Sequence, residues 1–282
     1  IQVKGPKGTL NQTLTALAEK AQVLVISPSA TSPDITDAGE FIFRTAPSDA
    51  FAGEVAARYA YGTLDKRNAA VLSENTDYAQ ALREVFTGRF QALGGKIVLD
   101  ETFNTGATDF TSQIIKIKAA QPDVIYLVPQ TAAPGVQLVK QLEAQEIDTQ
   151  LLTAEVLVGR DVVGENGKLM EGLIGIEAYF NKDGPRAKAL MDAYQQEYKK
   201  EAPYPFFMAN VHGQFFLIKE GIEKVGLDTA ALRDWLTTVE DWEGTMGKLT
   251  LDENGDPVLE AYSILQVTDG RLKDVEIFST KK

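Results

Sequence analysis

The sequence predicts an α/β protein with doubly wound parallel sheets. Short apolar runs predict strands at residues 23–26, 69–72, 96–99, 124–128, 151–153 and 173–176. Stretches of helical pattern, ten or more residues long, separate several of these runs, at 78–93, 108–121 and 135–144. Because strands that alternate with helices are joined by right-handed crossovers, this order predicts a parallel sheet.

The first run, residues 23–26, consists of Val, Leu and Ile without polar alternation. Such a run is typical of a strand buried on both faces of a parallel sheet. Glycine and proline mark where the following elements end: Gly94 and Gly95 follow the helix 78–93, and Pro122 ends the helix 108–121.

The pattern changes after about residue 180. Longer helical stretches are expected at 186–200, 210–225 and 229–239, followed by short strands at 248–250, 261–267 and 272–278. The turns at 252–257 and at Asp269-Gly270 are typical of hairpins. An α/β middle followed by helices and hairpins predicts two lobes, each visited by the chain more than once.

Composition excludes several classes of protein. The 282 residues carry a net charge of −12, with 44% hydrophobic and 24% charged residues. This acidic balance argues against nucleic acid or an anionic membrane as a partner, since both attract basic patches. The start of the sequence lacks the basic and apolar regions of a signal peptide, so an exported protein is expected to be a processed form.

Residue types that carry common catalytic and metal chemistry are scarce. The chain has no cysteine and a single histidine, which excludes thiolate catalysis and metal sites built on several of these residues. That histidine, His212, lies in an apolar helical pattern, where a packed or capped residue is expected. The sequence has neither of the glycine-rich phosphate loops, GxGxxG and GxxxxGK[ST]. The acidic turn 252–256 lacks the spacing of a calcium loop, and we expect neither a metal nor a cofactor.

Three polar features follow predicted strands, at the sheet edge where open α/β proteins bind small molecules. The first is the loop 27–34, which holds four hydroxyl groups and two prolines within eight residues. Proline fixes φ and biases the preceding residue to extended backbone, so Ser29, Ala30 and Thr31 are expected to present polar groups outward. An ordinary polar turn accounts for the same residues, and local chemistry leaves both interpretations open.

The other two features are the segment 74–78, which ends at Tyr78, and Glu155, which follows the strand 151–153. Apolar residues flank Glu155, and a carboxylate in such surroundings needs a partner of opposite charge. A ligand ammonium group would serve, and a glutamate on the surface or paired with a structural cation accounts for the same residue. Donors on one loop and a carboxylate on another suit an α-amino acid, whose own carboxylate the donors would hold.

The chain resembles the branched-chain amino-acid-binding proteins of bacterial ABC transporters, which are type I periplasmic binding proteins. The resemblance rests on residues 25–34, 43–49, 69–78, 106–110 and 122–126 and covers nearly the whole chain. It implies two α/β lobes, joined by three crossovers, that close around an amino acid. The first lobe would comprise residues 1–48 and 180–258, and the second 49–179 and 259–282.

The resemblance implies an extracytoplasmic or periplasmic solute-binding protein that passes a branched-chain or other aliphatic amino acid to a transporter permease. It also implies a monomer without enzymatic activity. A ligand-sensing domain of the same fold, serving a receptor or regulator, is the alternative. A small-molecule enzyme would need a base and a nucleophile together, and the sequence offers only Glu155 and Tyr78.

The resemblance also implies roles for individual residues. Ser29, Ala30 and Thr31 match positions that hold the ligand's ammonium and carboxylate through backbone and hydroxyl groups. Tyr78 matches a tyrosine of the second lobe that faces the ligand, and Glu155 matches the acid that pairs with the ammonium.

The sequence departs from the family pattern in three places. Gln130 falls where the family often has an aromatic residue near the side-chain pocket, which leaves the ligand preference open. The turn that holds the carboxylate is Gly5-Pro6-Lys7-Gly8-Thr9 here, so Thr9 or the backbone of Gly8 is expected to take that role. The family begins about two βα units earlier, so we expect the first lobe to lack its opening units: the chain is a fragment, a segment is missing, or another polypeptide supplies it.

Overall fold

The computed structural model describes residues 12–259 and 261–280, which fall into two compact units. Unit 1 takes its described residues from 1–48 and 179–260, and unit 2 takes them from 49–178 and 261–282. None of the helices in the described ranges is long and apolar enough to cross a membrane.

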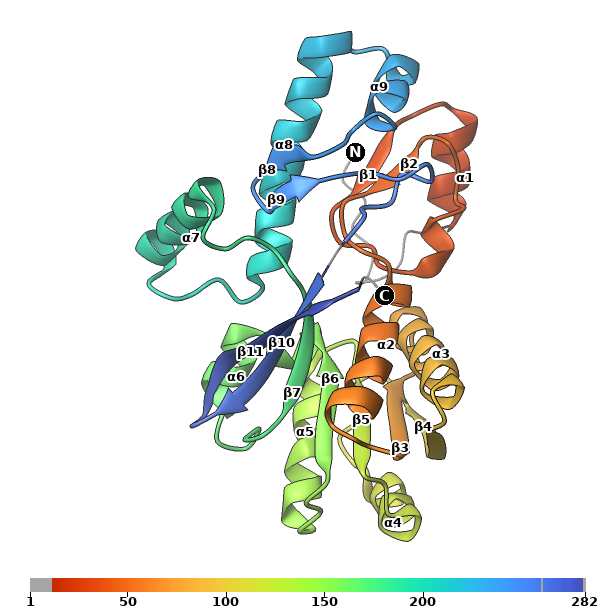
Figure 1. The fold of residues 1–282 in the computed structure, drawn as a ribbon, viewed down its shortest axis with the longest axis vertical. Coiled ribbons are helices and arrows are strands. Elements are labelled where there is room, and N and C mark those ends of the chain that lie inside the picture. The colour runs from red at the N-terminus through yellow and green to blue at the C-terminus, as the bar shows by residue number, and fades with distance from the viewer. Residues whose placement is uncertain (1–11, 260, 281–282) are drawn as a thin grey trace. The chain divides into compact units, whose positions relative to one another are not determined.

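Unit 2 is built on a seven-stranded sheet in the order β11-β10-β7-β6-β5-β3-β4 (Figure 1). Its strands are β3 (Asn68–Glu74), β4 (Lys96–Phe103), β5 (Val124–Val128), β6 (Gln150–Ala154), β7 (Ile174–Ala178), β10 (Ala261–Thr268) and β11 (Arg271–Ser279). The strands from β4 to β7 pair in parallel, whereas β10 is antiparallel to both β7 and β11. The structure thus confirms the predicted α/β fold with its parallel sheet and the hairpin at residues 269–270.

The helices of unit 2 begin and end where the sequence provides local signals. They are α2 (Asp49–Arg58), α3 (Asp77–Ala92), α4 (Thr111–Ala120), α5 (Ala132–Ala144) and α6 (Arg160–Asn166), with a short 3₁₀ helix at Glu155–Val158. The Thr76 hydroxyl accepts the Ala79 N–H at the start of α3, as an N-cap residue does. The helix ends before Gly94, whose φ of 98° lies in the left-handed region that glycine adopts without strain.

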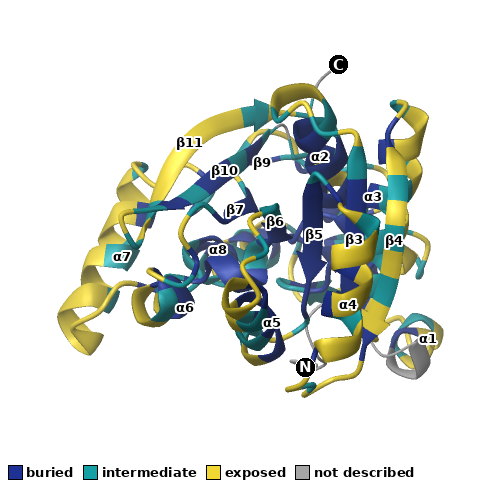
Figure 2. Ribbon diagram, turned by 90° about the horizontal axis from the view of Figure 1, so that it is seen from below, coloured by how far each residue is buried: buried dark blue, intermediate teal, exposed yellow. Residues whose placement is uncertain are grey.

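Both faces of the central strands of this sheet are covered, which explains their unbroken apolar runs. Along β5, the Tyr126 ring stacks on Phe86 of α3 with 4.3 Å between ring centroids. Ile125 and Leu127 point to the opposite face and join the core formed with α4, α5 and α6, because successive strand residues alternate between faces. Figure 2 shows β5 buried along its length and much of β11, at the edge, exposed.

Unit 1 contains two small sheets and four α-helices within the described ranges. Its elements are α1 (Gln12–Lys20), β1 (Val25–Ser27), β2 (Ile42–Arg44), α7 (Pro185–Tyr198), α8 (Pro205–Val225), α9 (Thr229–Leu236), β8 (Trp242–Gly244) and β9 (Gly247–Leu249). Strands β1 and β2 are parallel, and β8 and β9 are antiparallel. Phe43, Leu217 and Leu249 belong to a core that joins β2, α8 and β9.

One prediction for unit 1 is wrong. The run 23–26 does not form a strand buried on both faces: the strand begins at Val25, Val23 is 39% exposed, and Val25 and Ile26 are half-buried. Among the described residues β1 pairs with β2 alone, so its side chains are covered less completely than those of an interior strand. The fully buried strand of this pair is β2.

The acidic turn 252–256 is a tight turn, as predicted. The Asp252 carboxylate accepts the N–H groups of Asn254 and Asp256, both at 2.9 Å, and Gly255 has a φ of 77°. His212 lies on α8, where its ring contacts the Thr245 hydroxyl at 2.8 Å and the Phe216 ring. In the part of the chain that the structure describes, no three acidic, histidine or cysteine side chains gather as a metal site would require.

Candidate functional site

Three of the residues singled out in the sequence lie at one edge of the unit 2 sheet. Strands β3, β5 and β6 are adjacent and parallel, so their carboxyl ends meet at the same edge. Tyr78 follows β3 in the first turn of α3, Gln130 follows β5, and Glu155 follows β6. The topology therefore brings Tyr78, Gln130 and Glu155 together.

Glu155 begins the 3₁₀ helix after β6 and is half-buried, with Val156, Leu157 and Val158 buried behind it. Within the described ranges its carboxylate forms no ion pair, and the side chain that interacts with it is the nearby Tyr78 hydroxyl. A carboxylate in apolar surroundings is stabilised by an opposite charge. Its side chain can therefore accept a cation supplied from outside the protein.

The Glu155 carboxylate affects the pKa of Tyr78. Its side chain is 1% exposed, and its hydroxyl has no hydrogen-bond partner of ordinary geometry among the described residues. Burial, followed by the negative charge of Glu155, raises the pKa of Tyr78 well above 10. The hydroxyl therefore stays protonated at neutral pH and can donate to an oxygen.

A second buried tyrosine lies next to this pair. Burial, and then the charges of Asp49 and Glu155, raise the pKa of Tyr126 well above 10. Asp49 is the first residue of α2 and is 3% exposed. The region around Glu155 thus combines negative charge with neutral phenol groups.

The Gln130 backbone is held by an acid that the sequence analysis did not select. Glu74 ends β3 and is fully buried, and its carboxylate accepts the N–H of Gln130 at 2.7 Å and of Thr131 at 3.4 Å. These N–H groups lie at the start of α5, where Thr131 provides no side-chain cap. Glu74 belongs to the segment 74–78, of which the sequence analysis predicted only Tyr78 as a site residue. The signal that could have revealed Glu74 is its position as an acid at the end of an otherwise apolar run.

In unit 1, the loop 27–34 is organised by its own hydroxyl groups. Ser27 Oγ accepts the N–H of Ala30 at 3.0 Å and that of Ser29 at 3.4 Å. Ser32 is the N-cap of a 3₁₀ helix, Pro33–Ile35, and accepts the Asp34 N–H at 3.3 Å. Two of the four hydroxyls therefore stabilise turns.

The predicted ligand residues of this loop differ in their exposure. Ser29 is half-buried, whereas Ala30 and Thr31 are 4% and 6% exposed. The expectation that Ala30 presents its N–H outward is wrong, because the Ser27 side chain accepts that N–H. Gly8 and Thr9 lie outside the described residues.

Two buried side chains fix this loop from elsewhere in unit 1, and the sequence analysis did not predict them. Asn210 of α8 is 1% exposed and donates from Nδ2 to the Pro28 carbonyl at 2.8 Å. Arg44 of β2 is fully buried and donates from Nη1 to the Ser32 carbonyl at 2.7 Å. Asp256 compensates the Arg44 charge, with its two oxygens 2.6 Å from Nε and 2.5 Å from Nη2.

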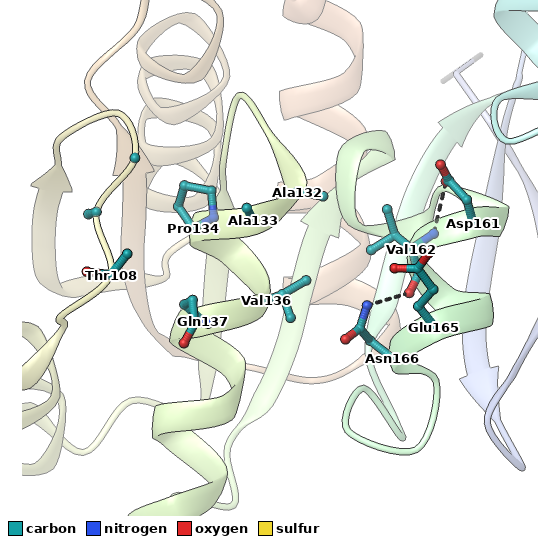
Figure 3. A pocket seen from close by; sticks show the side chains of 12 residues that line it. Thr108, Ala132, Ala133, Pro134, Val136, Gln137, Asp161, Val162, Glu165 and Asn166 are labelled. Carbon is teal, nitrogen blue, oxygen red and sulfur yellow. Dashed lines mark hydrogen bonds between the residues drawn. The ribbon is translucent and has the colours of Figure 1, made fainter.

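A hollow of about 500 Å³ opens elsewhere in unit 2, between α5 and α6 (Figure 3). Pro134 and Val136 lie on one side and Val162 on the other. Asp161 accepts the Val162 N–H, and Asn166 donates to the Val162 carbonyl, so both polar side chains serve α6 itself. None of the predicted ligand residues lines this hollow.

The chain is similar to a known protein family and to several of its curated members. The model of a family described as periplasmic binding protein matches residues 5–271. The Leu/Ile/Val-binding protein homolog 3 of Brucella melitensis is 29% identical over 257 residues, covering 90% of this chain and 69% of that protein. The leucine-, isoleucine-, valine-, threonine- and alanine-binding protein of Pseudomonas aeruginosa is 28% identical, covering 87% and 65%. The chain spans about two thirds of the length of these curated relatives.

Solved structures share the fold. The leucine-binding protein LivK of Thermotoga maritima matches with a TM-score of 0.85 and 24% identity, covering 94% of this chain and 76% of that one. The substrate-binding protein LivJ of Streptococcus pneumoniae, solved with isoleucine, matches with a TM-score of 0.83 and 25% identity. The match covers 95% of this chain and 76% of that one. A solute-binding protein of R. palustris, solved with benzoate, matches with a TM-score of 0.83 and 18% identity. The match covers 94% of this chain and 74% of that one.

Proposed function

Because this chain belongs to the periplasmic binding protein family, type I, we propose that it binds an aliphatic amino acid outside the cytoplasm for an ABC transporter. One relative is named as a leucine-, isoleucine-, valine-, threonine- and alanine-binding protein, another as a homolog of a Leu/Ile/Val-binding protein, and LivJ was solved with isoleucine. The proposed partner is the transporter permease, to which the chain delivers its ligand as a monomer and without chemical turnover.

The observation that carries the proposal is the carboxylate of Glu155 after β6, which has no cationic partner among the described residues. An ammonium ion beside it would form a charge-assisted hydrogen bond, which is stronger than a neutral one. Tyr78 supports this assignment, because a phenol kept protonated by burial and by Glu155 can donate to a ligand oxygen. An α-amino acid carries an ammonium and a carboxylate on one carbon, so it offers a partner to both side chains.

We propose the hydroxyl of Ser29, in unit 1, as a donor to a carboxylate. Ser29 is half-buried and its hydroxyl can donate, while the Ser27 hydroxyl, Asn210 and Arg44 hold the loop around it. A rigid loop loses little entropy when it binds, which favours affinity. Thr31 and the segment that contains Gly8 and Thr9 are proposed to add further donors.

A screen of thermal stability against the twenty amino acids, followed by calorimetry, tests the proposal. Leucine, isoleucine or valine is expected to stabilise the protein, by about 2.7 kcal/mol when present at a hundred times Kd. Micromolar affinity corresponds to about −8 kcal/mol. Benzoate belongs in the same screen, because binding of benzoate without any amino acid would replace the proposed ligand class.

The Glu155→Gln variant tests the carboxylate itself. We expect leucine affinity to fall by about a hundredfold, or ~2.7 kcal/mol, since the neutral amide cannot pair with an ammonium. Glu155→Ala is expected to abolish binding with the fold intact. Glu165→Gln, at an exposed acid of α6, is the matched control and should bind as wild type. Unchanged leucine affinity in Glu155→Gln would refute the assignment.

A further inference from the structure

A second carboxylate, Glu177, lies beside Glu155 at the same sheet edge. Strands β6 and β7 are parallel, and their last registered pair is Ala154 with Ile176. Glu177 is the next residue of β7, and Glu155 is the first residue after β6. Glu177 is 4% exposed. Burial raises its pKa, and the charge of Glu155 contributes in the same direction, so the two carboxylates interact.

Among the described residues, one of these two carboxylates, Glu177, has a cationic partner. Arg160, the first residue of α6, places Nη1 at 3.1 and 3.0 Å from the two Glu177 oxygens. The same nitrogen lies 3.4 Å from the Val158 carbonyl. In the described ranges, Glu155 has no such partner.

The guanidinium of Arg160 is not fully used by this pair. Its hydrogen bonds within the described ranges all go through Nη1, which leaves Nε and Nη2 without one. Arginine has five N–H donors and pairs readily with carboxylates. Arg160 follows Glu155 by five residues, across a single short helix, and its side chain is 20% exposed. It is therefore the nearest candidate in the sequence to neutralise Glu155.

We infer that Glu177 is a positioning residue: it holds Arg160 away from Glu155, so that the Glu155 carboxylate stays available for the ammonium of the ligand. This inference rests on the proposed function. If Glu177 has this role, the preference of the site for a ligand with an ammonium group depends on Glu177, which does not touch the ligand. Without Glu177, Arg160 would compete with the ammonium, and a ligand that has no ammonium would lose less affinity.

The test uses calorimetry with leucine and with 4-methylpentanoate, which is leucine without its amino group. In Glu177→Gln, leucine affinity is expected to fall about tenfold, or ~1.4 kcal/mol, while affinity for 4-methylpentanoate stays constant or rises. In the double variant R160Q/E177Q the competing cation is gone, and leucine affinity is expected to return to within about threefold of wild type.

The double variant separates positioning from a merely structural role. If the ion pair only supported the fold, both variants would weaken both ligands, and removing the second partner would restore nothing. R160Q/E177Q replaces the buried ion pair with two neutral amides, so it also tests the inference should Glu177→Gln alone fail to fold. Wild-type leucine affinity in Glu177→Gln, or loss of leucine binding in a folded double variant, would overturn the inference. Failure of the wild-type protein to bind any amino acid would instead overturn the proposed function, and this inference with it.

Discussion

Glu74 and Gln130 are 56 residues apart in the sequence, yet the Glu74 carboxylate accepts the Gln130 N–H at 2.7 Å. This contact joins the end of β3 to the loop after β5 and supplies the cap that the start of α5 otherwise lacks. The other oxygen of Glu74 is buried without a hydrogen-bond partner among the described residues. Glu74 thus fixes the backbone that follows β5.

Replacing Glu74 by alanine should destabilise unit 2. The N–H groups of Gln130 and Thr131 would lose their acceptor, and we expect the free energy of unfolding to fall by about 1–2 kcal/mol. Glu74→Gln keeps one acceptor oxygen and should lose less. Urea unfolding followed by circular dichroism measures both.

Asp109→Ala is the matched control for Glu74→Ala. The Asp109 carboxylate also accepts an N–H at the start of a helix, that of Thr111 at 2.9 Å, but Asp109 is exposed. Its removal should cost about 0.5–1 kcal/mol. Equal losses in the two variants would show that burial adds nothing to the Glu74 cap.

Breaking the buried ion pair of unit 1 should destabilise that unit strongly. Arg44 is fully buried, so Asp256→Asn would leave its charge uncompensated, and we expect a loss of about 3–5 kcal/mol. Replacing both partners with apolar residues, as in R44M/D256L, should recover most of that loss.

Asp65→Asn tests the same change at an exposed pair. The Asp65 side chain is 84% exposed and pairs with Arg67, and such pairs contribute about 0–1 kcal/mol. Both variants can be compared by urea unfolding at pH 7. A small effect of Asp256→Asn would contradict the assignment of Asp256 as the essential counter-ion.

Tyr78 should make stability fall at high pH. Burial and Glu155 raise its pKa well above 10 in the folded state, so the unfolded chain loses this proton first as the pH rises. Folding is therefore unaffected below about pH 9 and weakened progressively above about pH 10. Absorbance at 295 nm should show tyrosinate that appears only when the protein unfolds.

The variant Tyr78→Phe removes that dependence. Its stability relative to wild type should increase between about pH 9 and pH 11. Tyr198→Phe, which removes a hydroxyl at a 59% exposed site, is the matched control. A constant difference between Tyr78→Phe and wild type across this range would be inconsistent with a raised pKa of Tyr78.

Which elements could be predicted follows from how their residues are covered. The runs at β3, β5 and β6 are apolar because helices lie on both faces of the sheet, and the sequence shows this directly. Strand β2 is equally buried, but it contains the charged Arg44, which interrupts the apolar run. Helix α2 was not predicted because its buried residues are mostly small, Ala and Gly among them, and form no clear apolar stripe.

In the candidate site, the positions of the residues could be predicted from the sequence, but the contacts that support them could not. The positions of Tyr78, Gln130 and Glu155 follow from chain order, since each comes directly after a strand of one parallel sheet. The contacts that support them do not, because Glu74 meets residues 56 positions away and Asn210 meets a residue 182 positions away. A local pattern cannot show toward which distant backbone group a polar side chain turns.

Asn210 should matter for ligand affinity as well as stability. Its Nδ2 donates to the Pro28 carbonyl from a fully packed position on α8, so Asn210→Ala leaves that carbonyl unpaired. We expect the free energy of unfolding to fall by about 1–3 kcal/mol. Because Ser29 follows Pro28 directly, the loosened loop should also weaken leucine binding about tenfold, or ~1.4 kcal/mol, in calorimetry.

Asn166→Ala provides the control for this effect. The Asn166 amide also donates to a backbone carbonyl, that of Val162 at 3.0 Å, but within α6 and far in sequence from the loop 27–34. Its loss should lower stability with leucine affinity unchanged. Equal affinities in Asn210→Ala and Asn166→Ala would mean that the Pro28 contact supports the fold alone and that Ser29 needs no such anchor.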